Sequence, residues 1–174
     1  MDNLSQIKSN LRNIPNFPKP GINFKDITTI LNQTSIFKFV IDGLAQKLTT
    51  IDFDTIVAIE SRGFIFASPL AYILNKNLVL VRKKGKLPHK TFDIDYSLEY
   101  GINSLSIHQD SLSDQNKTVI IDDLIATGGT AKATYDLIQQ SGASVGCVLF
   151  FIELVALKGR HLFPDHLVQS LIQE

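Results

Sequence analysis

The sequence has 174 residues, a length that suits a single domain with a continuous apolar core. Its 17 basic and 17 acidic residues cancel, so the protein carries no net charge at pH 7. Proteins that bind the nucleic-acid backbone usually have a basic excess, so this balance argues against that class and requires any anionic ligand to be held by a local site.

The first part of the chain predicts two helices separated by a stiff loop. Apolar residues at helical spacing predict a first helix that ends before Pro15 and a second that starts near Ser35. Between them, residues 15–21 contain three prolines and a glycine, which favours an irregular loop. The apolar positions are Leu4, Ile7, Leu11 and Ile14 in the first helix, and Phe37, Val40, Ile41, Leu44 and Leu48 in the second.

The rest of the chain predicts two β–loop–α–β units. In the first, strands at 55–59 and 78–81 flank a helix at 64–74; in the second, strands at 118–121 and 145–152 flank a helix at 130–140. Strands that are apolar throughout and alternate with helices are typical of a parallel sheet covered on both faces, so we predict an α/β fold. The long polar stretch 83–100 lies between the units and is predicted to be a mobile functional loop.

The strongest functional signal is the segment 119–130, Val-Ile-Ile-Asp-Asp-Leu-Ile-Ala-Thr-Gly-Gly-Thr. It predicts a buried strand, a loop at 122–129 and a helix N-terminus, the place where parallel sheets bind ligands. Gly128 and Gly129 let the backbone approach a phosphate group, and the N–H groups near them can donate to its oxygens. Asp122 and Asp123 would repel a phosphate, so we expect them to accept hydrogen bonds from sugar hydroxyls or to stabilise a nearby cation. No Gly-Lys-Ser/Thr follows the glycines, so this is not a Walker loop.

This segment resembles the signature of type I phosphoribosyltransferases. The resemblance implies that Asp122 and Asp123 contact the ribose hydroxyls of 5-phosphoribosyl-1-pyrophosphate. It also implies that the loop holds the 5′-phosphate through Ala126, Thr127, Gly128, Gly129 and Thr130.

Five further segments, at 16–27, 60–64, 82–88, 96–101 and 153–160, are similar to adenine phosphoribosyltransferases and occur in the family's order. Asn16 departs from the aspartate that is usual in the family, and residues 89–95 also differ. The resemblance implies one phosphoribosyltransferase domain over 1–174, with an N-terminal hood at 1–34 and a mobile catalytic loop at 83–100. The implied activity is purine salvage, in which adenine and the phosphoribosyl donor give AMP and pyrophosphate.

The resemblance also assigns residues to each substrate. Arg62, Arg82, Lys83 and Lys86 are expected to bind the donor, with Mg²⁺ bridging its pyrophosphate and ribose oxygens. Protein ligands for the metal are not fixed by the sequence, although Asp122 and Asp123 are near its expected place. Expected to contact adenine are Ile22, Asn23, Phe24, Arg62 and Leu154; expected catalytic residues are Glu99, Arg62 and Tyr100. A homodimer is implied by resemblance alone.

We expect a cytoplasmic protein that is not embedded in a membrane. The N-terminus is polar, the most apolar stretch (147–152) is far too short to cross a bilayer, and the single cysteine, Cys147, cannot form an intrachain disulfide. Cys147 lies in an apolar run and is expected to be a buried structural thiol.

Three alternatives remain open at this point. A hypoxanthine/guanine or orotate phosphoribosyltransferase would share the donor motif but needs a different base-binding segment. A regulator that senses the donor and binds nucleic acid would need a basic face or a further domain. A third possibility is another phosphate-binding α/β protein.

Overall fold

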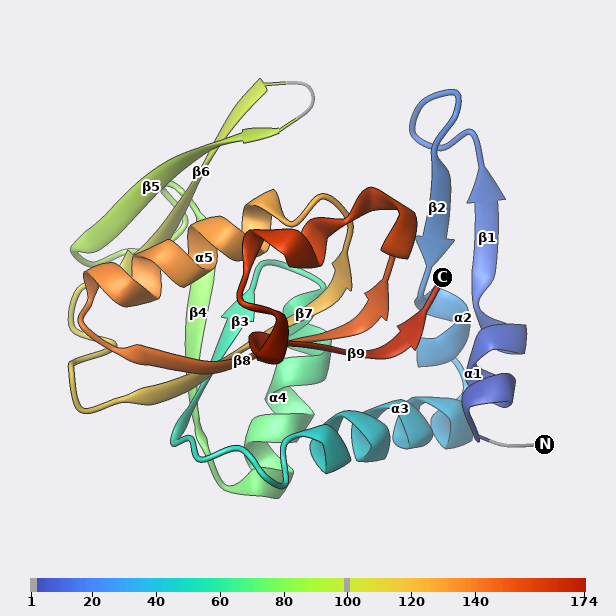
Figure 1. The fold of residues 1–174 in the computed structure, drawn as a ribbon, viewed down its shortest axis with the longest axis horizontal. Helices are drawn as coiled ribbons and strands as arrows, with labels where there is room; N and C mark the ends of the chain where they lie inside the picture. Colours follow the sequence, from blue (N-terminus) through green and yellow to red (C-terminus); the bar gives the residue numbers. More distant parts are fainter. Residues whose placement is uncertain (1–2, 99–100) are drawn as a thin grey trace. The chain divides into compact units, whose positions relative to one another are not determined.

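The structure, a computed structural model, describes residues 3–98 and 101–174 (Figure 1). The chain divides into two compact units, residues 1–43 and 44–174, and the boundary lies within helix α3 (Thr34–Lys47). Within the described residues, no helix is both long and apolar enough to cross a bilayer.

The first unit is a short helical and β-hairpin segment. It contains α1 (Asn3–Asn10), the antiparallel pair β1 (Arg12–Pro15) and β2 (Asn23–Asp26), and α2 (Thr28–Leu31). The prediction of one helix through Ile14 is wrong, because the helix ends at Asn10 and Ile14 instead pairs with Phe24 in the hairpin. Ile14 precedes Pro15, and a residue in that position is disfavoured from helical geometry and favours an extended one.

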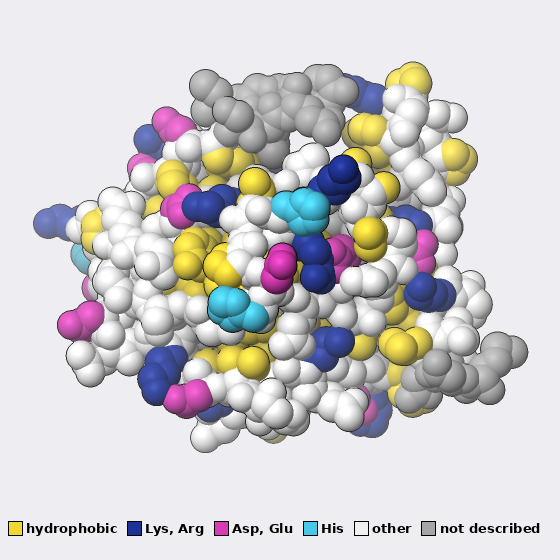
Figure 2. Space-filling view, in the orientation of Figure 1, with side chains coloured by type: hydrophobic (Ala, Val, Ile, Leu, Met, Phe, Trp, Pro, Cys, Tyr) yellow, Lys and Arg dark blue, Asp and Glu magenta, His cyan; other side chains and the backbone are white. Residues whose placement is uncertain are grey.

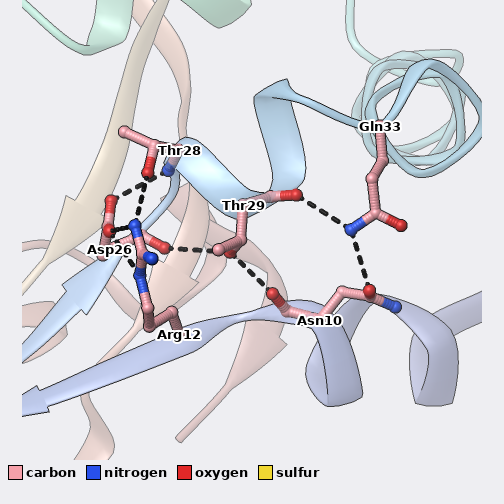
Figure 3. A network of polar contacts seen from close by, with 6 residues as sticks. All are labelled: Asn10, Arg12, Asp26, Thr28, Thr29 and Gln33. Carbon is pink, nitrogen blue, oxygen red and sulfur yellow. Dashed lines mark hydrogen bonds and ion pairs between the residues drawn. The ribbon is translucent and has the colours of Figure 1, made fainter.

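A polar network fixes the end of this hairpin (Figure 3). The carboxylate of Asp26 accepts a hydrogen bond from Arg12 Nε at 2.8 Å and another from the backbone N–H of Thr28 at 2.9 Å. Thr29 Oγ1 donates to the carbonyl of Asn10 at 2.6 Å. These bonds connect the end of α1, both strands and the start of α2, so the turn between strand and helix is held by polar groups from all of them.

The second unit is built on a seven-stranded sheet of order β5-β6-β4-β3-β7-β8-β9 (Figure 1). Strands β3, β4, β7, β8 and β9 are parallel, and β5 and β6 form an antiparallel hairpin beside β4. The strands are β3 (Thr55–Ile59), β4 (Asn77–Lys83), β5 (Thr91–Leu98), β6 (Gly101–His108), β7 (Lys117–Ile125), β8 (Ser144–Glu153) and β9 (Val168–Gln173). The helices are α4 (Gly63–Leu74) and α5 (Gly129–Gln140), followed by the 3₁₀ turns η1 (Val155–Leu157), η2 (Gly159–Leu162) and η3 (Asp165–Leu167).

Alternation along the central strands gives the sheet two apolar faces. Val57 and Phe150 belong to the core that contains α5 residues such as Leu137. The neighbouring Phe151 points the other way and packs against Phe66 of α4, with ring centroids 5.3 Å apart. The predicted α/β fold, a mostly parallel sheet with helices on both faces, is therefore confirmed.

The prediction of a loop throughout 83–100 is wrong for residues 91–98, which form strand β5. The alternation of Phe92, Ile94 and Tyr96 with polar residues produces this strand, since these three side chains pack against the core that includes α5. Whether this hairpin moves during catalysis stays a prediction.

The visible surface shows no block of one charge. Figure 2 shows Lys or Arg side chains interspersed with Asp or Glu over this face, as expected for a chain without net charge. Histidine and basic side chains gather where Figure 1 places the 3₁₀ turns, a segment that carries Lys158, Arg160, His161 and His166.

Candidate active site

A cavity of about 410 Å³ lies at the carboxyl ends of the central strands. Its wall begins at residues 60–62, which follow β3, and continues through residues 122–131, which end β7 and begin α5. Lys83 of β4 and three residues of the β5–β6 hairpin, Tyr96, Asn103 and Leu105, complete it. This is the edge at which open parallel sheets bind ligands.

Two helices begin at this cavity. Helix α4 starts at Gly63 and α5 at Gly129, directly after the lining residues Arg62 and Gly128. Gly63 lets α4 start against β7, since a Cβ there would lie 2.8 Å from the carbonyl oxygen of Ile121. The first N–H groups of a helix lack intrahelical acceptors and carry partial positive charge, so both helix starts favour an anion in the cavity.

The loop between β7 and α5 is short and tightly packed. It consists of residues 126–128, and Gly128 has a left-handed φ of 85°. A Cβ on Gly128 would lie 2.5 Å from the carbonyl oxygen of Gly159, so another backbone occupies the space that a side chain would need. Ala126, Thr127, Gly128, Gly129 and Thr130, the residues predicted to hold the phosphate, all line the cavity.

The two carboxylates stand on the strand itself. The prediction of a loop from 122 to 129 is wrong at its start, because Asp122 and Asp123 belong to β7, where Asp122 pairs with Phe150 of β8. The side chain of Asp123 is 5% exposed, and its Oδ2 lies 2.9 Å from Arg62 Nε. The structure thus brings Arg62, Asp122 and Asp123 together at the floor of the cavity.

Burial makes these carboxylates hold their protons more tightly. It raises the pKa of Asp122 well above the ordinary value, and the adjacent charge of Asp123 adds to the rise. Burial also raises the pKa of Asp123, although the Arg62 guanidinium opposes this. Hydroxyl donors or a cation arriving at this floor would stabilise the charged forms, so the carboxylates are suited to a ligand that carries such groups.

The predicted basic residues divide into two groups. Lys83 lines the cavity, whereas Arg82 and Lys86 are absent from the described lining. Arg82 is instead held by Glu60, with 3.1 Å between Nε and Oε2, and also donates to the carbonyl of Lys86 at 3.1 Å. Because Glu60 itself lines the cavity, Arg82 contacts the cavity wall without being part of its lining.

Tyr96, Asn103 and Leu105 line the cavity from the β5–β6 hairpin, although none of them is among the residues predicted to bind substrate. Thr130 Oγ1 donates to the hydroxyl of Tyr96 over 3.3 Å, so the hairpin contacts the start of α5. The alternating pattern along β5 was the signal that could have placed Tyr96 on the same face as Phe92 and Ile94.

The remaining predicted residues lie elsewhere or outside the description. Ile22, Asn23 and Phe24 belong to the first compact unit, where the ring of Phe24 packs edge-to-face on Phe17 with centroids 5.3 Å apart. Leu154 follows β8, and its N–H donates to the carbonyl of Ile125 at 3.0 Å. Glu99 and Tyr100 lie outside the described residues.

Comparisons with known proteins agree with this geometry. Residues 26–170 match the model of the phosphoribosyl transferase domain family. The adenine phosphoribosyltransferase of Caldicellulosiruptor saccharolyticus is 48% identical over 96% of this chain and 95% of its own. That of Crocosphaera subtropica is 50% identical over 95% of this chain and 98% of its own.

Solved structures give the same result. The adenine phosphoribosyltransferase of Thermoanaerobacter pseudethanolicus superposes with a TM-score of 0.95 at 46% identity, covering 98% of this chain and 99% of that one. The Saccharomyces cerevisiae enzyme, complexed with an imino-altritol bisphosphate and adenine, has a TM-score of 0.91 at 36% identity and covers 98% of both chains. The chain therefore belongs to the phosphoribosyl transferase family and, within it, to the adenine phosphoribosyltransferases.

Proposed function

We propose that this protein transfers the 5-phosphoribosyl group of 5-phosphoribosyl-1-pyrophosphate to N9 of adenine, giving AMP and pyrophosphate in purine salvage. One observation carries the proposal: a single cavity places a carboxylate pair beside a glycine loop and two helix N-termini. Such a cavity suits a ligand with sugar hydroxyls and several phosphate groups, which is the chemistry of the donor.

The donor is held by residues that line this cavity. The N–H groups and hydroxyls of residues 126–130 bind the 5′-phosphate, while Asp122 and Asp123 accept hydrogen bonds from the ribose hydroxyls. Arg62 and Lys83 contact the pyrophosphate, at the start of α4 and the end of β4. Arg82, bonded to Glu60 of the wall, and Lys86, whose carbonyl accepts from Arg82, add positive charge to the same region.

Mg²⁺ is the proposed cofactor, bound through the substrate. Within residues 3–98 and 101–174, no group of three His, Cys, Asp or Glu side chains is arranged to hold a metal ion alone. Magnesium commonly binds through one or two carboxylates together with phosphate oxygens, and Asp122 and Asp123 fit that mode. When bound, the ion would neutralise charge on the departing pyrophosphate.

The reaction is a displacement at ribose C1 through an oxocarbenium-like transition state. The phosphate and ribose contacts orient the donor, which lowers the entropic part of the barrier. Arg62, held by Asp123, stabilises the charge of the leaving group. Glu99 transfers a proton to or from the purine ring or hydrogen-bonds to it, and Tyr100 is the other proposed catalytic residue of this segment. Both assignments rest on the resemblance of residues 96–101 to the family.

By resemblance to the family, we propose that adenine stacks on Phe24, flanked by Ile22 and Asn23, and that backbone groups of this segment and near Arg62 and Leu154 recognise it. Backbone carbonyls accept from the 6-amino group of adenine but face the 6-oxo group of hypoxanthine or guanine unfavourably. An unpaired polar atom costs about 1–3 kcal/mol, which would suffice to discriminate between these bases.

We also propose that the protein is a homodimer. Ile65, Tyr72 and Ile73 lie on one outer side of α4 and are 37%, 86% and 50% exposed. On β4, Leu78 and Leu80 are 38% and 37% exposed, whereas their neighbours Val79 and Val81 belong to the core with α5. Leu78 and Leu80 therefore face the same side of the sheet as α4 and extend its apolar surface, which a second copy would bury.

Light scattering after size-exclusion chromatography tests the dimer. Tyr72→Glu should shift the protein toward the monomer, while Leu4→Glu, at a residue of α1 that is 42% exposed, should not. A Tyr72→Glu protein with the mass of the wild type would remove this surface from the interface.

We further infer that the enzyme works in the cytoplasm, because its one cysteine is a free, buried thiol.

The function is tested by offering adenine, hypoxanthine, guanine and orotate separately with the donor and Mg²⁺, and following nucleotide formation by chromatography. A preparation from expression-host cells that lack this protein, purified identically, controls for enzyme carried over from the host. We expect AMP from adenine alone. Product from another base would overturn the base assignment, and donor binding without any product would favour a regulator.

A further inference from the structure

The end of β8 carries a buried carboxylate that the proposed mechanism does not use. The side chain of Glu153 is 4% exposed and lies 2.6 Å from Arg160, measured from Oε1 to Nε. Arg160 Nη2 donates to the other oxygen at 3.0 Å, so the pair is bidentate. Ser170 Oγ and Gln173 Nε2 of β9 also donate to Oε2, at 2.7 and 3.2 Å. Both oxygens of this carboxylate therefore accept hydrogen bonds, which fix its position.

These hydrogen bonds keep Glu153 ionised. The hydrogen bond from Arg160 lowers the pKa of Glu153, and it outweighs the opposing effect of burial. The same contact raises the pKa of Arg160. A bidentate pair with this geometry defines both distance and orientation, which a single contact to a lysine would not do.

The segment between Glu153 and Arg160 touches the phosphate-binding loop. A Cβ on Gly159 would lie 2.3 Å from the carbonyl oxygen of Ala126 and 2.8 Å from the N atom of Gly128. Lys158, the residue before Gly159, has a left-handed φ of 56°. Such a conformation is unfavourable for a residue with a side chain and persists only where the surroundings hold it.

Both ends of the phosphate-binding loop are thus held from the segment that starts at Glu153. Before the loop, Ile125 pairs with Glu153 in the sheet. At its end, Gly128 lies against Gly159, the residue adjacent to Arg160. Neither Glu153 nor Arg160 is among the described residues that line the cavity, so any effect they have on the substrate passes through this loop.

We propose that Glu153 and Arg160 are positioning residues, whose ion pair holds Gly159 against residues 126–128 and so sets the geometry of the phosphate-binding N–H groups. The proposal rests on the proposed function for the identity of the phosphate ligand. Breaking the pair releases Gly159, and the loop then loses the backbone that limits its position. Because orientation of a bound substrate is sensitive to displacements of about 1 Å, donor binding should suffer more than the integrity of the fold.

The test compares Arg160→Gln and Arg160→Lys with a matched structural control, Asp54→Asn. Asp54 precedes β3, at the amino ends of the strands, whereas the cavity lies at their carboxyl ends. It accepts hydrogen bonds from the backbone N–H of Lys117 at 2.8 Å and from Asn116 at 2.9 Å. Its substitution should lower the thermal midpoint without changing the KM for the donor. Arg160→Lys retains the positive charge and guards against loss of folding in Arg160→Gln.

We expect Arg160→Gln to raise the KM for the donor about 10- to 100-fold, with a smaller change in kcat, and Arg160→Lys to be intermediate. The affinity for ribose 5-phosphate, measured by calorimetry, should fall in the same order. A KM within about twofold of the wild type in both folded Arg160 variants, or an equal rise in Asp54→Asn, would overturn the proposal. If the wild type binds ribose 5-phosphate but makes no AMP, the proposed function fails, and the calorimetric order alone decides for or against the positioning role.

Discussion

Replacing Gly128 with alanine tests whether the contact between two backbones controls donor binding. Alanine must first adopt the left-handed φ of 85°, which costs about 1–2 kcal/mol. Its Cβ would then lie 2.5 Å from the carbonyl oxygen of Gly159, whereas real Cβ contacts essentially never fall below 3.0 Å, so the two backbones must separate by at least 0.5 Å. A displacement of about 1 Å can cost about 100-fold in rate, so we expect kcat/KM for the donor to fall about 10-fold or more.

Gly142→Ala is the matched control. Gly142 follows the other end of α5 with a φ of 88°, and the nearest atom to a Cβ there is Asp114 Cβ at 3.5 Å, an ordinary contact. In both variants alanine must adopt a left-handed φ, at a similar cost in free energy. Only in Gly128→Ala does the new Cβ also clash with a backbone atom. Thermal unfolding and steady-state kinetics on both proteins separate the two effects. Equal kcat/KM for the donor in the two alanine variants would refute the reasoning.

Other predictions follow from single side chains. Asp122→Asn/Asp123→Asn should raise the KM for the donor about 10-fold or more, and much less that for adenine, because charge-assisted hydrogen bonds to the ribose are lost; unaltered donor kinetics would sink the ribose assignment. Glu99→Gln should lower turnover by roughly 10²–10⁴-fold, and unchanged turnover would remove Glu99 from the mechanism. The folded-state pKa of Glu153 is lowered, so its contribution to stability is fully present above the unfolded-state pKa of about 4.3 and is lost as the pH falls through the lower folded-state value. The difference in urea unfolding free energy between wild type and Glu153→Gln should therefore shrink on acidification, and a constant difference would contradict this. Burial raises the pKa of Cys147 to about 12, so a thiol reagent at pH 8 should label the protein only after denaturation, and labelling of the native protein would show that the thiol is accessible.

The parallel core and the phosphate-binding loop could be predicted because their signals are local. Apolar strands such as 55–59 are read directly from composition, and Gly128 and Gly129 mark the turn into α5. The sequence predicts that β7 ends at Ile121, which is too early, because charged residues usually end a buried strand. Here β7 continues through Asp122 and Asp123, since β8 pairs with it as far as Ile125 and Arg62 offsets one of the two charges.

What could not be predicted depends on contacts between distant segments. Tyr96 enters the cavity because β5 and β6 pair beside β4 and pack over α5, an arrangement that composition alone does not reveal. The role of Gly159 is equally hidden, since its lack of a side chain is needed only where the backbone of Ala126 approaches it. The ion pair of Glu153 with Arg160 spans a turn whose shape is set by Lys158, and nothing in the spacing of these residues fixes that shape.

The order of the strands has a consequence for how the protein folds. Strand β3 pairs on one side with β4, which follows soon after it, and on the other with β7, so that Thr55 lies opposite Thr118. The β5–β6 hairpin lies within the intervening stretch and can form from local contacts alone, whereas the β3–β7 pair must first close a long loop at an entropic cost. The cavity needs both β3 and β7, and so it comes into existence only with the slow, long-range step of folding. Recovery of donor binding during refolding therefore marks the completion of the central sheet.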